Sequence, residues 1–300
     1  MSEHDHGGDR DRLAVVLGIT TTVLLAEVVG AFVSGSLALL ADAGHMLTDA
    51  AGLLIALIGA GLATRPATAA RTWGYQRAEV LAATLQAAVL LAVGVLVLVE
   101  AVRRLAEPTP VASTAMMVFG VLGLLGNLAS MLVLTARRGS SLVTRAAFLE
   151  VVSDALGSVA VLVAATVIAV TGWLRADAVV SILIGALILP RTLRLLRETT
   201  EVLLESTPPG LDLDDVRRHL LALPHVHAVH DLHASRIASH LPVLTAHVVI
   251  DDSCFQDGHA PQVLDELQDC VARHFPVAVE HSTFQLEPRS HAEHERTSHP

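Results

Sequence analysis

One imidazole and three carboxylates stand inside segments of the chain that are otherwise apolar. His45 and Asp49 lie four residues apart in one segment, and Glu150 and Asp154 repeat that spacing in another. Residues four apart share one face of an α-helix, so each segment carries a single polar stripe. If the stripes face each other, one nitrogen and three oxygen donors converge, which suits a four-coordinate divalent cation.

Ionisable residues within a membrane span are costly, about 2.5–3.5 kcal/mol each on insertion scales, and usually functional. Two matched pairs, one of them containing the lone histidine between Gly7 and Arg218, favour a metal site. The alternative is that these groups only pack helices together or relay protons. Asp42 lies on the same face as His45, and we do not rank it as a primary ligand.

The segments that carry these stripes belong to a strongly apolar chain. Of the 300 residues, 52% are hydrophobic and 17% are charged, against about 25% charged in soluble domains, and the mean hydropathy is +0.56. A spanning helix needs about 20 mostly apolar residues. Six such stretches, separated by turn residues, predict a helical membrane domain over 13–200: 13–33, 37–63, 78–102, 111–136, 142–171 and 174–196.

Arginine predicts the orientation of these spans. With a cytoplasmic N-terminus, eleven flanking arginines fall on the cytoplasmic side, and Arg103, Arg104 and Arg175 fall on the opposite side. Such a bias is the positive-inside pattern. We therefore expect a multi-pass protein of the inner (plasma) membrane, surrounded by lipid, with both termini in the cytoplasm.

A polar domain follows the last span, over 207–288. Its periodicity predicts the order α-β-β-α-β, which suits a small α+β domain of helices on a sheet. The expected elements are a helix over 212–223, strands over 226–237 and 242–250, a helix over 261–275 and a strand over 277–286. Residues 1–12 and the histidine-containing tail 289–300 lack core-forming residues and are expected to be disordered.

Several classes of protein are excluded or disfavoured by composition. Cys254 and Cys270 are the only cysteines, so this is no disulfide-rich secreted domain. A net charge of −10 argues against nucleic-acid binding. No His-Glu-x-x-His motif occurs, which argues against a metalloprotease. We do not expect this protein to be an enzyme. A passive divalent-cation channel and a membrane-anchored metal sensor stay open as alternatives to a transporter.

Five segments resemble the cation diffusion facilitator family, in matching order over residues ~10–288. They are Ala-Asp-Ala-Gly-His-Met-Leu-Thr-Asp at 41–49, Gly-Tyr-Gln-Arg-Ala-Glu at 74–79, Phe-Leu-Glu-Val-Val-Ser-Asp-Ala-Leu-Gly-Ser at 148–158, Val-His-Asp-Leu-His at 229–233, and His-Ser-Thr-Phe-Gln-Leu-Glu at 281–287. The resemblance implies six transmembrane helices followed by a ferredoxin-like (αββαβ) cytoplasmic domain. It also implies a homodimer that exports Zn²⁺ or related divalent ions from the cytoplasm in exchange for protons. The metal is then substrate, and no prosthetic group is implied.

Glu150 departs from the pattern of the zinc-specific members, which usually have histidine at this position. One nitrogen and three oxygens form a harder ligand set than two of each, so selectivity is expected to relax toward manganese, iron, cobalt or cadmium, with zinc still accepted. His45 is the expected proton carrier, because the reference pKa of histidine lies nearest neutrality.

Thirteen of the sixteen histidines follow residue 218, and most of them are expected to be surface residues. His230, His233, His247 and His281 lie on or at the ends of predicted strands, where the resemblance implies cytoplasmic metal binding. His240, His259 and Glu287 are weaker candidates, and the alternative is a domain that only dimerises. Elsewhere we expect Asn127 to hydrogen-bond across helices, and Glu27, Glu79 and Glu100 to pair with helix ends or line vestibules.

Overall fold

The computed structural model describes residues 4–47, 50–51, 67–135 and 142–291, with side chains from residue 15 onward and, in the last range, from 148. The chain divides into two compact units. One comprises Met1–Ala60 and Ala82–Leu196, and the other comprises Gly61–Leu81 and Arg197–Pro300. We treat each unit by itself, as the membrane unit and the polar unit.

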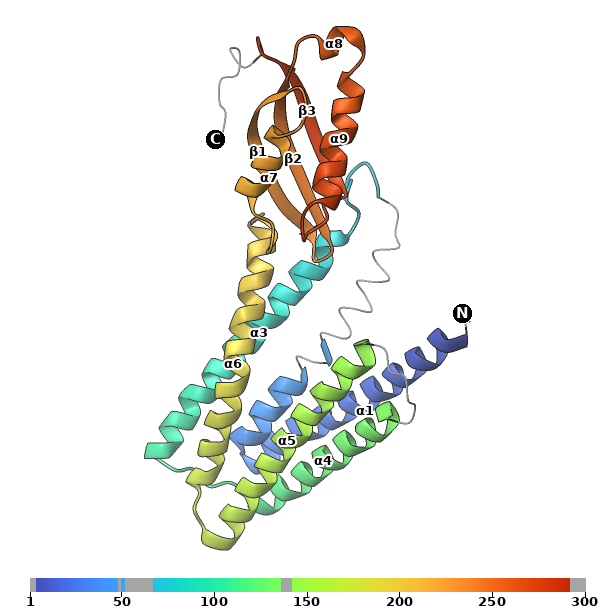
Figure 1. Ribbon diagram of the computed structural model, residues 1–300. Helices are drawn as coiled ribbons and strands as arrows, with labels where there is room; N and C mark the ends of the chain where they lie inside the picture. The colour runs from blue at the N-terminus through green and yellow to red at the C-terminus, as the bar shows by residue number, and fades with distance from the viewer. Residues whose placement is uncertain (1–3, 48–49, 52–66, 136–141, 292–300) are drawn as a thin grey trace. The chain divides into compact units, whose positions relative to one another are not determined.

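The membrane unit is helical (Figure 1). Five helices of the described chain are long and apolar enough to cross a membrane, and a shorter apolar helix spans Leu37–Leu47. Apart from residues 50–51, the remainder of the second predicted span, including Asp49, lies outside the described residues. The long helices are α1 (His4–Ser34), α3 (Gln76–Ala106), α4 (Ser113–Thr135), α5 (Leu142–Thr171) and α6 (Arg175–Leu203).

Helix ends differ from the sequence prediction at the two polar margins. Helix α1 begins at His4, within the segment 1–12 that we expect to be disordered, and α6 continues to Leu203 rather than ending at 196. Once an apolar span has nucleated a helix, each further residue fixes only its own backbone dihedrals and gains one hydrogen bond. The helix can therefore extend into its polar flanks. Turns end the helices where expected, with Gly35 and Gly172 both at φ +70°.

The helix Leu37–Leu47, which carries His45, is held at its N-terminus by a residue from another helix. The carboxylate of Asp177 on α6 accepts hydrogen bonds from the hydroxyl of Ser36 at 2.5 Å and from the backbone N–H groups of Leu37 at 2.9 Å and Ala38 at 3.1 Å. Asp177 is 1% exposed. It satisfies donors that a helix N-terminus leaves without partners.

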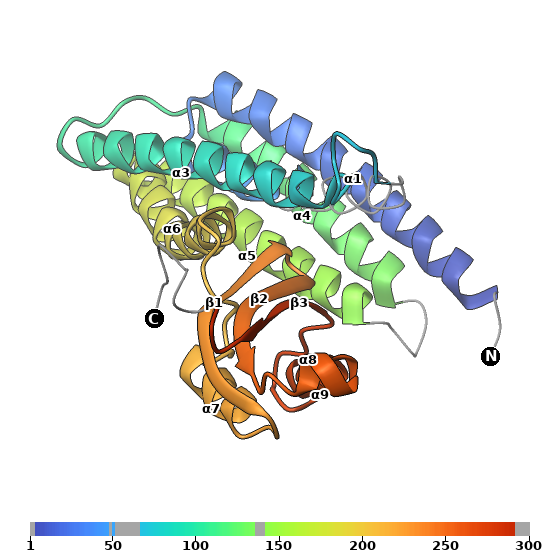
Figure 2. The ribbon, with the colours of Figure 1, turned by 90° about the horizontal axis from the view of Figure 1, so that it is seen from above.

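The polar unit has the predicted α+β architecture. Its elements are α7 (Leu213–Leu221), β1 (Val226–Ala238), β2 (Leu241–Ile250), α8 (Cys254–Asp257), α9 (Ala260–Arg273) and β3 (His281–Pro288). The sheet order is β1-β2-β3, with β1 antiparallel and β3 parallel to the central β2. Because parallel neighbours need a crossover, α9 connects β2 to β3. Helices α7 and α9 lie on the same face of the sheet (Figure 2).

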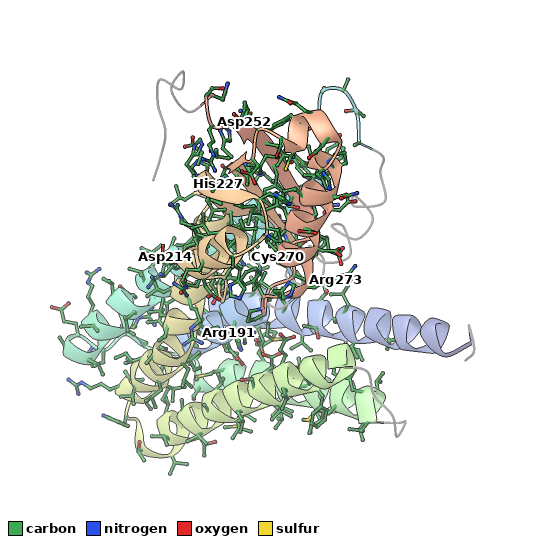
Figure 3. The ribbon with its side chains drawn as sticks, turned by 45° about the horizontal axis from the view of Figure 1, so that its top comes forward. Arg191, Asp214, His227, Asp252, Cys270 and Arg273 are labelled. Carbon is green, nitrogen blue, oxygen red and sulfur yellow. The ribbon has the colours of Figure 1, made fainter. Side chains whose placement is uncertain are left out.

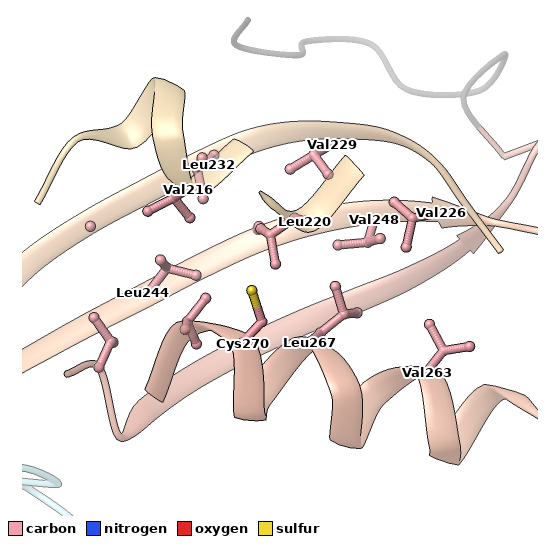
Figure 4. Close-up of a cluster of buried hydrophobic side chains, with 14 of the residues drawn as sticks. Val216, Leu220, Val226, Val229, Leu232, Leu244, Val248, Val263, Leu267 and Cys270 are labelled. Carbon is pink, nitrogen blue, oxygen red and sulfur yellow. The ribbon is translucent and has the colours of Figure 1, made fainter. Parts of the chain in front are cut away.

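A single apolar core joins this sheet to its helices (Figure 4). Val216 and Leu220 of α7 and Leu267 of α9 are completely buried against inward residues of the strands. The last strand lies four residues later than the predicted start at 277, because Val277 and Val279 pack as irregular chain against this core. The short helix α8 was not predicted, since four residues give no detectable periodicity.

Candidate metal centres

The membrane unit brings His45 and Asp154 together. Nε2 of His45, on the helix Leu37–Leu47, lies 3.6 Å from Oδ1 of Asp154 on α5. The side chain of Asp154 is 2% exposed and that of His45 is 14% exposed. An imidazole nitrogen and a carboxylate oxygen thus meet inside the apolar helices, where one cation can contact both. Asp49, the predicted partner of His45, lies outside the described residues.

Glu150 lies one turn from Asp154 on α5 and has a different environment. Its side chain is 39% exposed, and its Oε1 lies 3.4 Å from Nη2 of Arg191 on α6. Arg191 is labelled in Figure 3. In the sequence, Arg191 is one of the eleven arginines that flank the predicted spans on the side of the N-terminus. A fixed guanidinium next to a candidate ligand reduces the negative charge available to a metal ion. Its position could have indicated this contact, because Arg191 lies near the C-terminal end of the predicted span 174–196 and Glu150 lies near the N-terminal end of the predicted span 142–171.

Two further carboxylates are buried in the membrane unit besides that of Asp154. Asp42, one turn before His45, is 1% exposed, and Glu27 of α1 has no exposure. The hydroxyl of Ser158 on α5 donates to Oδ2 of Asp42 at 3.4 Å. Nδ2 of Asn127 on α4 donates to the same hydroxyl oxygen at 3.3 Å, which confirms the predicted bond across helices. Glu100 pairs with Arg104 one turn further along α3.

The polar unit gathers a second ligand cluster from all three strands. His230, His247 and Glu287 each offer one ligand atom, and these atoms lie within 4.8 Å of one another. Oε2 of Glu287 is 3.3 Å from Nε2 of His230, and its Oε1 is 2.9 Å from Nδ1 of His247. Glu287 is 1% exposed. His230 and His247 are opposite each other in the β1–β2 register, which is why residues so far apart in sequence converge.

The other two predicted cytoplasmic ligands lie elsewhere. His233 is exposed on β1 opposite Thr245, beyond an irregularity in the strand pairing that follows His230. His281 is exposed at the start of β3, where its ring packs edge-on against Trp73 at 4.7 Å. Glu287, a weaker candidate from the sequence, is instead the residue that completes the cluster. Phe284 and Leu286 of β3 pack against the apolar core, so alternation places Glu287 on the opposite face of the sheet, the face that also carries His247 of β2.

Most remaining histidines of the polar unit form ordinary surface pairs. His225 and His227 both hydrogen-bond the carboxylate of Asp251, at 3.0 and 2.6 Å. These two hydrogen bonds, of which the one with His227 has the larger effect, lower the pKa of Asp251 below its usual value. His259 pairs in the same way with Asp257 at 2.8 Å, and His240 is exposed at the turn between β1 and β2. Neither weaker candidate joins the cluster around Glu287.

Comparisons with known proteins match both units. The family model described as the cation efflux transmembrane domain matches residues 13–204, and the model described as the cation efflux protein, cytoplasmic domain, matches residues 208–289. The chain belongs to the cation diffusion facilitator family, whose members are transporters and not enzymes.

Named relatives cover nearly the whole chain. The metal cation efflux system protein CzcD of Cupriavidus metallidurans is 45% identical over 95% of this chain and 89% of its own. The zinc transporter ZitB of Escherichia coli is 41% identical over 92% and 87%. A cadmium, cobalt and zinc/H(+)-K(+) antiporter of Bacillus subtilis is 33% identical over 96% and 92%. The chain is therefore a multi-pass membrane protein for the efflux of divalent metal cations.

Proposed function

We propose that this transporter moves Zn²⁺ and related divalent ions out of the cytoplasm in exchange for protons, with His45, Asp49, Glu150 and Asp154 as its ligands. The observation that carries the proposal is the approach of His45 Nε2 to Asp154 Oδ1, at 3.6 Å, inside the helical unit. Helical spacing adds Asp49 and Glu150 one turn from each of these residues.

Exchange follows from the chemistry of the ligands. A metal ion binds neutral imidazole and ionised carboxylates, so its binding releases the protons that these groups hold. Without metal, adjacent carboxylates repel one another, which favours proton uptake by at least one group of the site. Protons supplied from the far side of the membrane then compete for the same ligands and release the metal there. No separate coupling element is required.

The selectivity is proposed to be broader than zinc alone. Glu150 makes the ligand set harder, with three oxygens and one nitrogen, and such a set accepts cobalt, manganese and iron as well as zinc. The Bacillus subtilis relative is named for cadmium, cobalt and zinc, which supports a mixed range of metals.

The cluster of His230, His247 and Glu287 is proposed to bind a second divalent ion in the cytoplasm. Two imidazoles and a carboxylate match the ligand types of zinc, and water can supply the fourth position. We further propose that the chain works as a homodimer through its cytoplasmic domain, with both termini on the cytoplasmic side of the inner membrane, as the arginine distribution predicts.

Flux through the purified protein in proteoliposomes tests the exchange. With zinc inside the vesicles and a higher proton concentration outside, zinc flux is expected to rise with the pH gradient. In Asp154→Asn the flux is expected to fall at least about tenfold, because the metal loses a charged ligand; tenfold corresponds to about 1.4 kcal/mol. Glu100→Gln is the matched control, since Glu100 pairs with Arg104 instead. Zinc flux that is unchanged when the pH gradient is collapsed would contradict proton exchange.

The cytoplasmic site is tested by metal stoichiometry. In equilibrium dialysis of the full-length protein, His247→Gln is expected to bind about one zinc fewer per chain, because two remaining ligands hold zinc weakly. His240→Gln is the control, since His240 lies outside the cluster. An unchanged zinc count in His247→Gln would show that this cluster is not a zinc site.

A further inference from the structure

Glu27 is a buried carboxylate that the transport mechanism above does not use. It lies in the apolar part of α1 with no exposure, and among the described residues neither of its oxygens has a hydrogen-bond partner. An ionised carboxylate that has lost water and gained no donor is strongly disfavoured. Ionisable groups in such places usually mark ion or proton pathways.

Two glycines on neighbouring helices make room for buried carboxylates. A Cβ atom at Gly123 of α4 would collide with Oε1 of Glu27, and a Cβ atom at Gly157 of α5 would collide with Oδ1 of Asp42. Helices α1 and α5 both pack against α4, so these positions lie within one contiguous helical packing. Any larger residue at either glycine would displace the carboxylate, so these two positions leave room for the acidic side chains.

The environments of the two carboxylates differ. Asp42 accepts a hydrogen bond from Ser158, which in turn accepts one from Asn127. Glu27 has no such donor and is repelled by the charges of Asp42 and Asp154. Where neighbouring carboxylates have unlike surroundings, one stays ionised and the other holds the proton.

The groups that face Glu27 can be named helix by helix. The helix Leu37–Leu47 contributes Asp42 and α5 contributes Asp154, each of which acts on Glu27 through its charge. Helix α4 contributes the backbone of Gly123, which carries no charge. No described cationic side chain is paired with Glu27. The field at Glu27 is therefore set by carboxylates, one of which is a proposed metal ligand.

We propose that Glu27 is a proton-binding site of the transport cycle that does not itself ligate the metal. Glu27 holds a proton while the metal site is empty. When a divalent cation binds at Asp154, its positive charge removes the repulsion, the O–H bond of Glu27 breaks, the electron pair stays on the carboxylate, and the proton passes to water. Metal release reverses the step. This inference rests on the proton exchange proposed above.

The number of protons released per zinc bound tests the role of Glu27. Titration calorimetry of the full-length protein in detergent, in two buffers of different ionisation enthalpy at one pH, measures this number. Wild type is expected to release protons, and Glu27→Gln about one fewer per zinc, because an amide cannot give up a proton to water. Glu100→Gln is the matched control and is expected to keep the wild-type number.

The outcomes separate this inference from the proposed function. Wild-type proton release that persists undiminished in Glu27→Gln would overturn the role of Glu27 and leave proton exchange standing. Wild type that releases no protons would overturn both. Infrared difference spectra of the wild type give a second test that needs no variant: zinc binding is expected to remove a protonated-carboxyl C=O band, and a spectrum without that loss would overturn the inference.

Discussion

At the scale of single residues, the ligands of the proposed transport site have unlike neighbours. Asp154 is 2% exposed and lies against His45, whereas Glu150, one turn away, is 39% exposed and lies against Arg191. The two carboxylates therefore differ in how much positive protein charge competes with a metal ion for them. Because the carboxylate at 150 is both hard and partly neutralised, we expect it to set the range of metals more than the affinity for any one of them.

A histidine at position 150 tests this reading. Glu150→His gives two nitrogen and two oxygen donors, which favours zinc over manganese. In proteoliposomes the ratio of zinc to manganese flux is expected to rise about tenfold, equivalent to about 1.4 kcal/mol. Glu150→Gln is the control, because it removes the charge without adding an imidazole. An unchanged metal profile in Glu150→His would refute the role assigned to this residue.

At the scale of elements, the helix Leu37–Leu47 depends on α6 for its position. The buried carboxylate of Asp177 receives the first N–H groups of that helix, and negative charge at a helix N-terminus is also favoured by the helix dipole. Arg104 of α3 donates to the carbonyl oxygen of Gly35 at 2.6 Å in the same region. His45 is thereby held two turns from a fixed helix end.

Removing this cap should loosen the helix that carries His45. Asp177→Ala is expected to lower the free energy of unfolding by about 0.5–2 kcal/mol, the usual range for loss of an N-cap. Thermal unfolding of the detergent-solubilised protein measures the effect, and zinc binding measured beside it is expected to weaken. Asp177→Asn, which keeps an acceptor oxygen, is the control and should lose less. Equal midpoints for wild type and Asp177→Ala would contradict the capping role.

The order of elements could be predicted from the sequence because it depends on local periodicity. Apolar runs predict the spans, and alternation predicts β1 and β2 to within one residue at each end. Contacts between elements could not be predicted in the same way. Arg191 near Glu150 depends on how α5 and α6 pack, and Glu287 in place of His233 depends on the register of three strands. Neither contact leaves a signal within any single segment.

At the scale of the whole molecule, ionisable groups are placed according to two kinds of environment. The spans bury a few carboxylates and a single histidine among aliphatic side chains, where each charge needs a metal ion, a proton or a donor. The polar unit holds most of the histidines, and there many of them pair with exposed carboxylates at little cost. Among the described residues of the polar unit, only the cluster at Glu287 combines two imidazoles with a buried carboxylate.

The central claim is that His45 and Asp154 hold the transported ion, and the position of a bound ion tests it most directly. Anomalous diffraction at the zinc edge, from crystals of the full-length protein grown with zinc, locates the metal without reference to activity. We predict a peak within bonding distance of His45 Nε2 and a carboxylate oxygen of Asp154, at about 2.0–2.2 Å, and no such peak in Asp154→Asn. Zinc bound in the membrane unit away from both side chains would contradict the account.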